Sequence, residues 1–152
     1  MFPTGEKILP LNKDIVLGFN KLMEKMILLL DADEKECEEL CALLNDQQFR
    51  TVSIHSLPEM ITFIQDIECL VVIMDLDSIP IDNRTIRELT VKYPGVYFLC
   101  ISSDRFHPHL KESLCYHIYA CINKPVDPDE LVYWVRSIYK DNSAPIKSCA
   151  AD

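Results

Sequence analysis

Glycine is the residue that this sequence most noticeably lacks. Three glycines occur in 152 residues, and Gly95 is the only one between Met26 and Lys140. A loop that cradles phosphate with backbone N–H groups, and the dinucleotide-binding fingerprint, both need several glycines at fixed spacing. The main part of the chain therefore contains neither motif, and phosphate bound there has to be held by side chains or by a metal ion.

The sequence also lacks an excess of positive charge. It has 15 Lys and Arg residues against 24 Asp and Glu residues, which gives a net charge of −9. A strongly acidic protein repels polyanions, so direct binding to nucleic acid or to an acidic membrane is not its expected main function. An effect on nucleic acid would have to pass through a partner protein.

Long hydrophobic runs and paired cysteine motifs are missing as well. No apolar run reaches membrane-spanning length, and the first 25 residues lack the features of a secretory signal peptide. The seven cysteines are scattered, and several lie within apolar stretches, where a thiol acts as a small hydrophobic group. These features favour a cytoplasmic protein with reduced thiols.

Five short apolar segments recur along the chain. They are continuous rather than alternating, which is typical of strands buried on both faces, and apolar residues at helical spacing follow each of them. The expected strands are Met26–Leu30, Phe49–Ile54, Leu70–Met74, Val96–Ser102 and Tyr119–Asn123. Because each parallel strand needs a crossover, the pattern predicts an α/β fold with a parallel sheet and helices on both faces.

Two helix starts are clearly marked. Ser56 precedes Pro58 and Glu59, and Asp127 precedes Pro128 and further acidic residues. Serine and aspartate are favoured caps, and proline is favoured in the first turn of a helix. We therefore expect helices to begin just after Ser56 and Asp127.

Polar residues stand where the expected strands end. They are Asp31 and Asp33 after the first strand, Asp75 and Asp77 at the third, Ser102 and Ser103 at the fourth, and Lys124 at the fifth. Ligands of open parallel sheets bind outside the carboxyl ends of the strands, so these side chains are expected to share one crevice. Clustered carboxylates repel one another and favour a bound cation, and Mg²⁺ with phosphate oxygens suits such ligands. Lysine and serine can hold the phosphate.

These residues resemble the site of the receiver domains of bacterial two-component response regulators, the chemotaxis-type family. The resemblance covers about Met26 to Tyr139 and rests on the segments ILLLDAD, VVIMD, LCIS and INKPVDPDEL. It implies a flavodoxin-like, doubly wound (βα)5 fold with strand order 2-1-3-4-5. Residues 1–25 would then be an amino-terminal arm, helical in part, residues 26–140 the receiver domain, and residues 141–152 a flexible tail or linker.

The resemblance also assigns roles to the site residues. It implies that Asp75 is the phospho-accepting nucleophile, that Ser102 is the switch hydroxyl and that Lys124 contacts the phosphoryl group. It also implies that Asp31 helps to hold Mg²⁺, with the carbonyl of Asp77 as a further ligand. The chemistry of the clustered carboxylates adds Asp33 and Asp75 as candidate ligands of Mg²⁺. The Lys124–Pro125 peptide bond is expected to be cis.

The function that the resemblance implies is regulatory rather than enzymatic. A histidine kinase or a phosphotransfer protein would donate the phosphoryl group to Asp75, and the acyl phosphate would switch a protein-interaction surface. A homodimer is one of the alternatives for the oligomeric state, and the amino-terminal arm packs either on a partner chain or on its own domain.

Among the positions at which the sequence departs from the family, Ala32 and Cys121 bear most directly on the function. Ala32 replaces the second member of an acidic pair, so either Asp33 substitutes for it or Mg²⁺ binds weakly. Cys121 stands where the family has an aromatic switch residue, with Tyr119 two positions earlier. Ala32 supports one alternative, an interaction module of the same fold that is not phosphorylated. A second alternative is a phosphohydrolase that resembles the haloacid dehalogenases, whose nucleophile motif is similar to DLDS at Asp75.

Overall fold

The structure of the protein is a computed structural model that describes residues 25–104 and 111–143. Residues 1–24, which make up nearly all of the predicted arm, lie outside the described residues, and so do residues 144–152 of the predicted tail. The last described helix continues beyond residue 140, where the tail was predicted to begin. The boundaries of the arm and the tail stay predictions.

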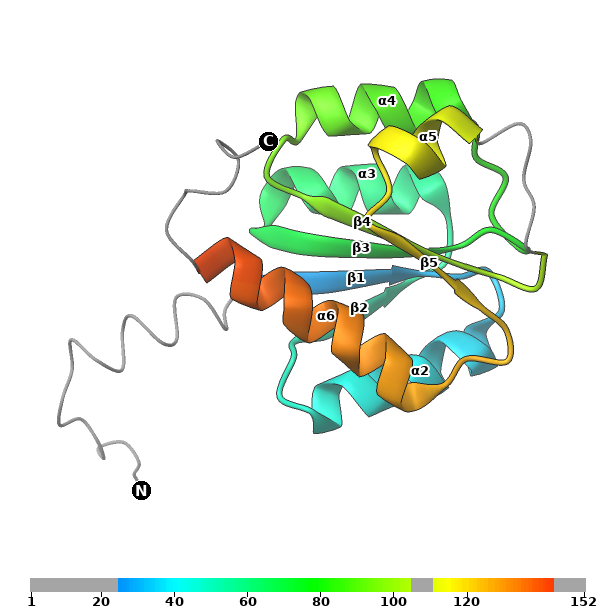
Figure 1. The fold of residues 1–152 in the computed structure, drawn as a ribbon, viewed down its shortest axis with the longest axis vertical. Helices are drawn as coiled ribbons and strands as arrows, with labels where there is room; N and C mark the ends of the chain where they lie inside the picture. Colours follow the sequence, from blue (N-terminus) through cyan, green and yellow to red (C-terminus); the bar gives the residue numbers. More distant parts are fainter. Residues whose placement is uncertain (1–24, 105–110, 144–152) are drawn as a thin grey trace, which may run out of the picture.

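The predicted strands form one parallel sheet (Figure 1). The strands are β1 (Met26–Leu30), β2 (Thr51–Ile54), β3 (Cys69–Asp75), β4 (Tyr97–Ser102) and β5 (Ala120–Asn123). They lie in the order β2-β1-β3-β4-β5, and all neighbours are parallel. The α/β class and the 2-1-3-4-5 order are therefore confirmed.

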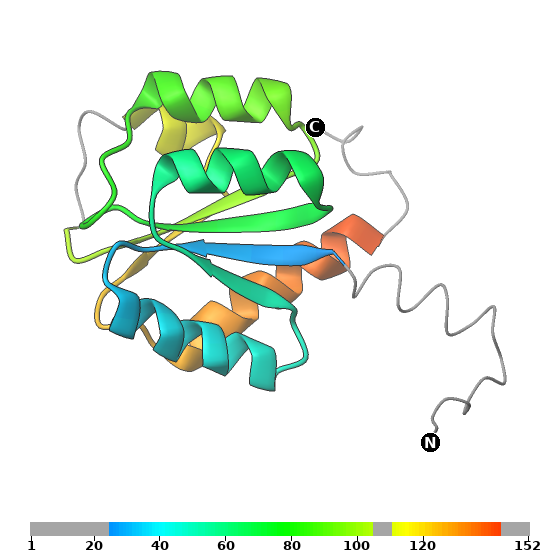
Figure 2. The ribbon, with the colours of Figure 1, turned by 180° about the vertical axis from the view of Figure 1, so that it is seen from behind.

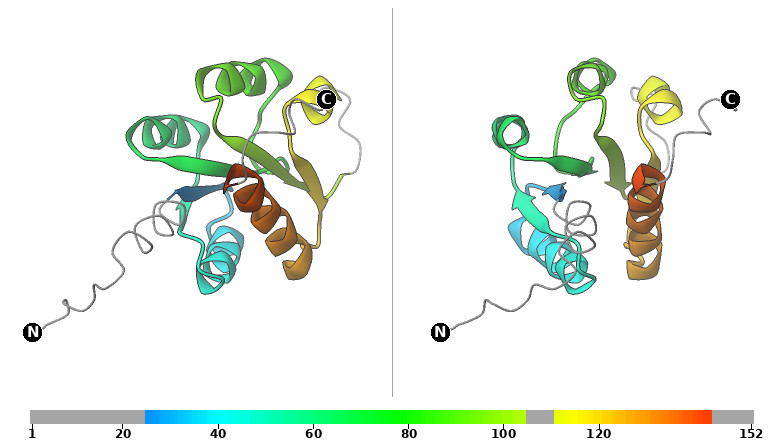
Figure 3. Two further views of the ribbon diagram at one scale, coloured as in Figure 1. Left: turned by 60° about the vertical axis from the view of Figure 1, so that its left-hand side comes forward. Right: turned by 90° about the vertical axis from the view of Figure 1, so that its left-hand side faces the viewer.

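Helices cover both faces of this sheet (Figures 2 and 3). One face carries α2 (Glu34–Asp46) and α6 (Pro128–Ser143). The other carries α3 (Leu57–Asp66), α4 (Asn83–Lys92) and the short α5 (Lys111–Tyr116). None of the helices in residues 25–104 and 111–143 is long and apolar enough to cross a membrane.

The sheet divides the hydrophobic core into two layers. Successive strand residues point to opposite faces, so Ile27 and Leu29 pack towards α2 and α6, whereas Leu28 and Leu30 pack towards α3 and α4. All four side chains are buried. Both faces of β1 are thus covered, which explains why its sequence is continuously apolar rather than alternating.

Both predicted helix starts are confirmed. The Ser56 hydroxyl accepts a hydrogen bond from the Glu59 N–H at 3.3 Å, and the Asp127 carboxylate accepts one from the Asp129 N–H at 3.0 Å. Each cap satisfies a backbone donor that the helix itself leaves without a partner. These local signals fix where α3 and α6 leave the sheet.

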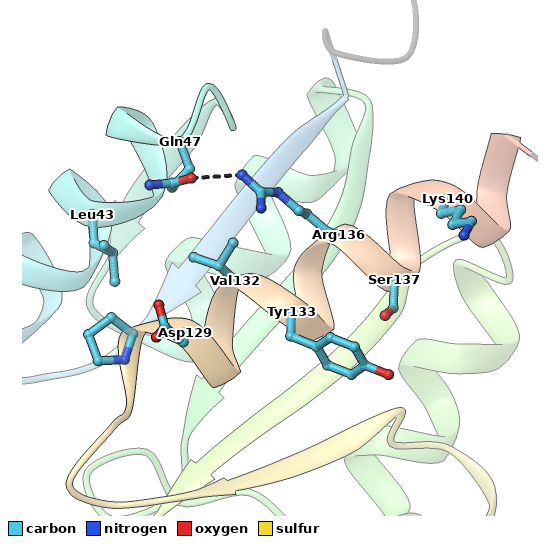
Figure 4. A pocket seen from close by; sticks show the side chains of 9 residues that line it. Leu43, Gln47, Asp129, Val132, Tyr133, Arg136, Ser137 and Lys140 are labelled. Atoms are coloured by element: carbon cyan, nitrogen blue, oxygen red, sulfur yellow. Dashed lines mark hydrogen bonds between the residues drawn. The ribbon is translucent and has the colours of Figure 1, made fainter.

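A groove of about 500 Å³ lies between α2 and α6 (Figure 4). Leu43 and Val132 contribute apolar lining, and the Arg136 guanidinium donates a hydrogen bond across it to the Gln47 amide oxygen at 2.8 Å. None of the residues that line the groove is a predicted site residue. The groove therefore concerns the packing of the two helices and not the strand ends.

Helix α2 ends without a glycine. Gln48, which follows the C-cap Gln47, has φ of 76° and takes the left-handed conformation that glycine usually supplies. The Phe49 N–H donates to the Leu44 carbonyl and the Gln48 N–H to the Asn45 carbonyl, both at 3.0 Å. This is the Schellman arrangement, and it shows why β2 begins at Thr51 instead of the predicted Phe49: Phe49 belongs to the helix end.

The left-handed Gln48 gives a stability prediction. We expect Gln48→Gly to raise the free energy of unfolding by about 1 kcal/mol, because a non-glycine residue in this conformation costs about that much. The matched control is Ala42→Gly at an exposed interior position of α2, which should lower it by about 1 kcal/mol. Urea unfolding followed by circular dichroism measures both. Destabilisation by Gln48→Gly would contradict the assigned cap.

Candidate functional site

The backbone brings the predicted site residues together at the carboxyl ends of the strands. Sheet hydrogen bonding continues past the strand ends, because the Asp31 N–H donates to the Ile54 carbonyl at 3.0 Å and the Lys124 N–H to the Ser102 carbonyl at 2.9 Å. Asp75 is the last residue of β3 and Ser102 the last of β4. These residues are therefore positioned by the sheet rather than by free loops.

Three carboxylates form a cluster that could hold a metal ion. Asp31, Glu36 and Asp75 each offer an oxygen, and these oxygens lie within 4.8 Å of one another. Asp31 and Asp75 are buried and Glu36 is half-buried. Asp31 and Asp75 were predicted for this role, whereas Glu36, which comes from the first turn of α2, was not.

Asp33 makes a different contact. Its carboxylate caps α2 by accepting the Glu36 N–H at 3.1 Å, and its own N–H donates to the Asp31 carboxylate at 2.9 Å. The spacing Asp33-x-x-Glu36 is similar to that of a capping box, in which the glutamate would reach back to the N–H of the cap. Because Asp31 takes that N–H, the Glu36 side chain is available to the cluster. A metal-binding role of Asp33 stays a prediction.

The Lys124 ammonium lies among the carboxylates. Its Nζ is 2.9 Å from Asp75 Oδ2, 3.1 Å from Asp77 Oδ2 and 3.4 Å from Glu36 Oε1. Burial alone would lower the pKa of Lys124, but the hydrogen bonds to Asp75 and Asp77 outweigh it and the pKa is raised. Lys124 is therefore held in its charged form.

Ser102 and the following residue face Asp77. The Ser102 hydroxyl is 3.4 Å from Asp77 Oδ1, and it also contacts the backbone of Asp104. The Ser103 N–H donates to Asp77 Oδ2 at 3.0 Å, and the Asp77 N–H donates to Asp75 Oδ1 at 2.9 Å. Burial works to raise the pKa of Asp77, but Lys124 and Ser103 outweigh it and lower the pKa. The carboxylate of Asp77 is thus bound by Lys124, the Ser103 N–H and the Ser102 hydroxyl, and it is not one of the three clustered carboxylates.

Asp31 is a buried carboxylate whose surroundings change its pKa. Its Oδ1 accepts hydrogen bonds from the Asp33 N–H and from the Ser78 hydroxyl at 3.0 Å. Burial raises the pKa of Asp31 to about 6, the nearby charge of Asp75 adds to the rise, and the two hydrogen bonds oppose it. The crowding of acids predicted from the sequence is therefore present.

Two further expectations concern the fifth strand. The Lys124–Pro125 peptide bond is cis, as the resemblance implied. Cys121, which stands where the family has an aromatic switch residue, is exposed. Tyr119 packs edge-on against Tyr97 and Trp134. The Tyr119 hydroxyl donates to the Asp141 carboxylate at 2.8 Å. Tyr119 is therefore part of an aromatic group beside β4 and α6.

Comparisons with known proteins agree on the fold. No protein-family model and no curated protein matches the chain. Among solved structures it is similar to the signal receiver domain of an HD domain-containing protein from Pseudomonas fluorescens Pf-5, with 20% identity, a TM-score of 0.70, and coverage of 78% of this chain and 97% of that one. A CheY-like response regulator receiver domain protein from Methanospirillum hungatei JF-1 gives 17% identity, a TM-score of 0.70, and coverage of 78% and 95%.

A two-component response regulator from Clostridium difficile is similar over 79% of this chain and 99% of its own, with 14% identity and a TM-score of 0.69. The neighbours are matched over nearly their whole length. The chain therefore has the fold of response regulator receiver domains. This confirms the flavodoxin-like architecture that the resemblance implied.

The raised pKa of Asp31 gives a second prediction. A carboxyl whose folded pKa exceeds its unfolded value lowers the stability of the protein as the pH rises from about 3.8 to about 6, because the unfolded state releases its proton in this range while the folded state still holds it. Asp31→Asn keeps the oxygen that accepts both hydrogen bonds but removes the charge. Without metal at pH 7 we expect it to raise the free energy of unfolding by about 1–2 kcal/mol.

The measurement is urea unfolding of both proteins with a metal chelator at pH 4 and pH 7. The two stabilities should differ at pH 7 and converge towards pH 4, where Asp31 is protonated. A gap of equal size at both pH values would contradict the electrostatic cause.

Proposed function

We propose that the chain is a phospho-accepting receiver domain of a two-component signalling system. The observation that carries this proposal is the meeting of the acidic cluster with an ammonium group: Lys124 Nζ lies 2.9 Å from Asp75 at the edge of the three carboxylates. A nucleophilic carboxylate and a fixed cation at one strand end are what phosphoryl transfer to aspartate requires.

The chemistry assigned to the residues is a displacement at phosphorus. A carboxylate oxygen of Asp75 forms the new O–P bond while the bond to the donor breaks, and the electron pair of that bond leaves with the donor, the imidazole of a histidine kinase or phosphotransfer protein. Lys124 offsets charge on the phosphoryl oxygens, and the Ser102 hydroxyl donates to one of them. The product is an acyl phosphate on Asp75.

The carboxylates fit a hard divalent cation. Mg²⁺ prefers oxygen ligands and keeps several waters, and Asp31, Glu36 and Asp75 offer three oxygens at one place. Once bound, the cation would supply positive charge to the site and to the phosphoryl oxygens. Asp33 and the carbonyl of Asp77 stay as further candidate ligands.

We infer that the module is regulatory and cytoplasmic, with a histidine kinase or phosphotransfer protein as its partner. The acyl phosphate would change a surface near α5, β5 and α6, because Ser102 and Lys124 stand at the ends of β4 and β5 in that half of the sheet. Turnover of a simple phosphate ester is not expected, and its detection would favour the haloacid dehalogenase alternative.

A second candidate function is an interaction module that is not phosphorylated. The observation in its favour is Ala32, which lacks the carboxylate expected at the end of β1 and lies exposed there. In the described residues Glu36 provides a carboxylate from α2 at the cluster, which weighs against this candidate. Labelling decides between the two.

The labelling prediction is direct. With acetyl phosphate and Mg²⁺ we expect the native chain to gain the mass of one phosphoryl group, and Asp75→Asn to gain none, because the amide cannot act as the nucleophile. Intact-mass spectrometry measures both, with Asp66→Asn, an exposed acid of α3, as the control that should label like the native chain. Equal labelling of native protein and Asp75→Asn would exclude the assigned nucleophile, and no labelling at all would support the second candidate.

Metal binding provides a separate prediction. We expect Glu36→Gln to weaken Mg²⁺ binding by roughly tenfold, as loss of a charged ligand does. Asp33→Asn should have a smaller effect, because asparagine caps a helix about as well as aspartate. Titration of amide resonances with Mg²⁺ measures the affinities, and Glu39→Gln, an exposed residue of the same helix, is the control. A larger loss with Asp33→Asn would assign the ligand to Asp33 instead.

A further inference from the structure

Three hydrogen-bond donors surround the carboxylate of Asp77. Its Oδ2 accepts the Ser103 N–H at 3.0 Å and lies 3.1 Å from Lys124 Nζ, and its Oδ1 is 3.4 Å from the Ser102 hydroxyl. The donors come from the end of β4 and from the residue after β5, so separate strands aim them at one place. An ammonium, a backbone N–H and a hydroxyl around one carboxylate make an anion-binding site that the chain fills with its own side chain.

The backbone around Asp77 explains how the side chain reaches these donors. The Asp77 N–H donates to Asp75 Oδ1 at 2.9 Å, and the Ile79 N–H donates to the Asp75 carbonyl at 3.0 Å, so the chain turns directly after β3. The turn places the Asp77 side chain over the end of β4, where it remains 30% exposed. The side chain can therefore swing out to solvent without disturbing the core.

The same donors face the position that a phosphoryl group on Asp75 would take. Lys124 Nζ contacts Asp75 Oδ2 and Asp77 Oδ2 at the same time, so the two carboxylates share one ammonium. A carboxylate presents two charged oxygens in a plane, much as two of the three oxygens of a phosphoryl group. Both groups cannot use the Ser103 N–H and the Lys124 ammonium together, because each is anionic and like charges at this distance repel.

We propose that the Asp77 carboxylate is an internal ligand of the phosphoryl-oxygen subsite formed by Ser102, Ser103 and Lys124, and that it must leave before a phosphoryl group can engage these donors. This inference rests on the proposed function for its biological meaning. Asp77 then acts as a built-in competitor that slows phosphorylation of Asp75. Its carboxylate is separate from the three carboxylates of the metal cluster.

A merely structural role predicts the opposite result. If Asp77 served only to order the segment after β4, its removal would loosen Ser102 and Ser103 and weaken the binding of any anion. Competition instead predicts that removal frees the donors and tightens anion binding. The direction of the change therefore separates the two explanations.

The first arm of the test uses inorganic phosphate and does not depend on phosphorylation. With Mg²⁺ present, inorganic phosphate is titrated into the full chain and the Ser103 amide resonance is followed by NMR. We expect Asp77→Asn and Asp77→Ala to bind phosphate about tenfold more tightly than the native chain, the factor that corresponds to about 1.4 kcal/mol. Asp104→Asn removes the same charge from an exposed position in the neighbouring segment and should stay near the native affinity.

The second arm measures the rate of labelling by acetyl phosphate in the same proteins. We expect Asp77→Asn to label several-fold faster than the native chain and Asp104→Asn to label at the native rate. Equal or weaker phosphate binding by both Asp77 variants overturns the inference, whatever the labelling shows. Tighter phosphate binding by the Asp77 variants together with no labelling of any protein would support the inference about Asp77 and overturn the proposed function instead.

Discussion

The arrangement of the site depends on the contacts between the Lys124 ammonium and the surrounding carboxylates. Asp31, Glu36, Asp75 and Asp77 meet near the ends of β1 and β3, and like charges at such distances repel by amounts comparable to a large part of a domain's stability. Lys124 contacts Glu36, Asp75 and Asp77. The backbone N–H groups of Asp33, Asp77 and Ser103 donate to Asp31, Asp75 and Asp77 respectively. Among these four acids of the described residues, Lys124 does not contact Asp31, and burial raises the pKa of Asp31 to about 6.

The fold makes this crowding tolerable because it fixes the positions of the acids before any ligand arrives. The sheet is buried on both faces by α2 and α6 and by α3 and α4, so the strand ends cannot splay apart to relieve the repulsion. The repulsion among the acids lowers the stability of the fold, and the burial of the hydrophobic core offsets this loss. Such a site is suited to binding a cation and a phosphoryl group, since both reduce the repulsion that the apo protein carries.

The sequence predicts the fold well because its strongest signals are also the physical causes. Continuous apolar segments become strands buried on both faces, and Ser56 and Asp127 become helix caps because each side chain accepts an N–H from the first turn of the helix that follows it. Asp31, Asp75, Ser102 and Lys124 could be placed because each stands directly at a strand end. Glu36 could not, since its orientation depends on whether Asp31 or Glu36 takes the Asp33 N–H, and that choice is made by the packed structure.

The same reasoning explains what Ala32 means for the site. An acid at position 32 would have added a carboxylate from the loop after β1, but the residue there is alanine and the loop continues directly into the cap at Asp33. The third carboxylate of the cluster comes from α2 instead. Glu36 is flanked by the buried Cys37, whose thiol donates to the Leu29 carbonyl at 3.4 Å, so this turn of the helix is attached to β1. A carboxylate carried on a packed helix has less freedom than one carried on a loop, and its contribution to the site then depends on how firmly α2 is held against the sheet.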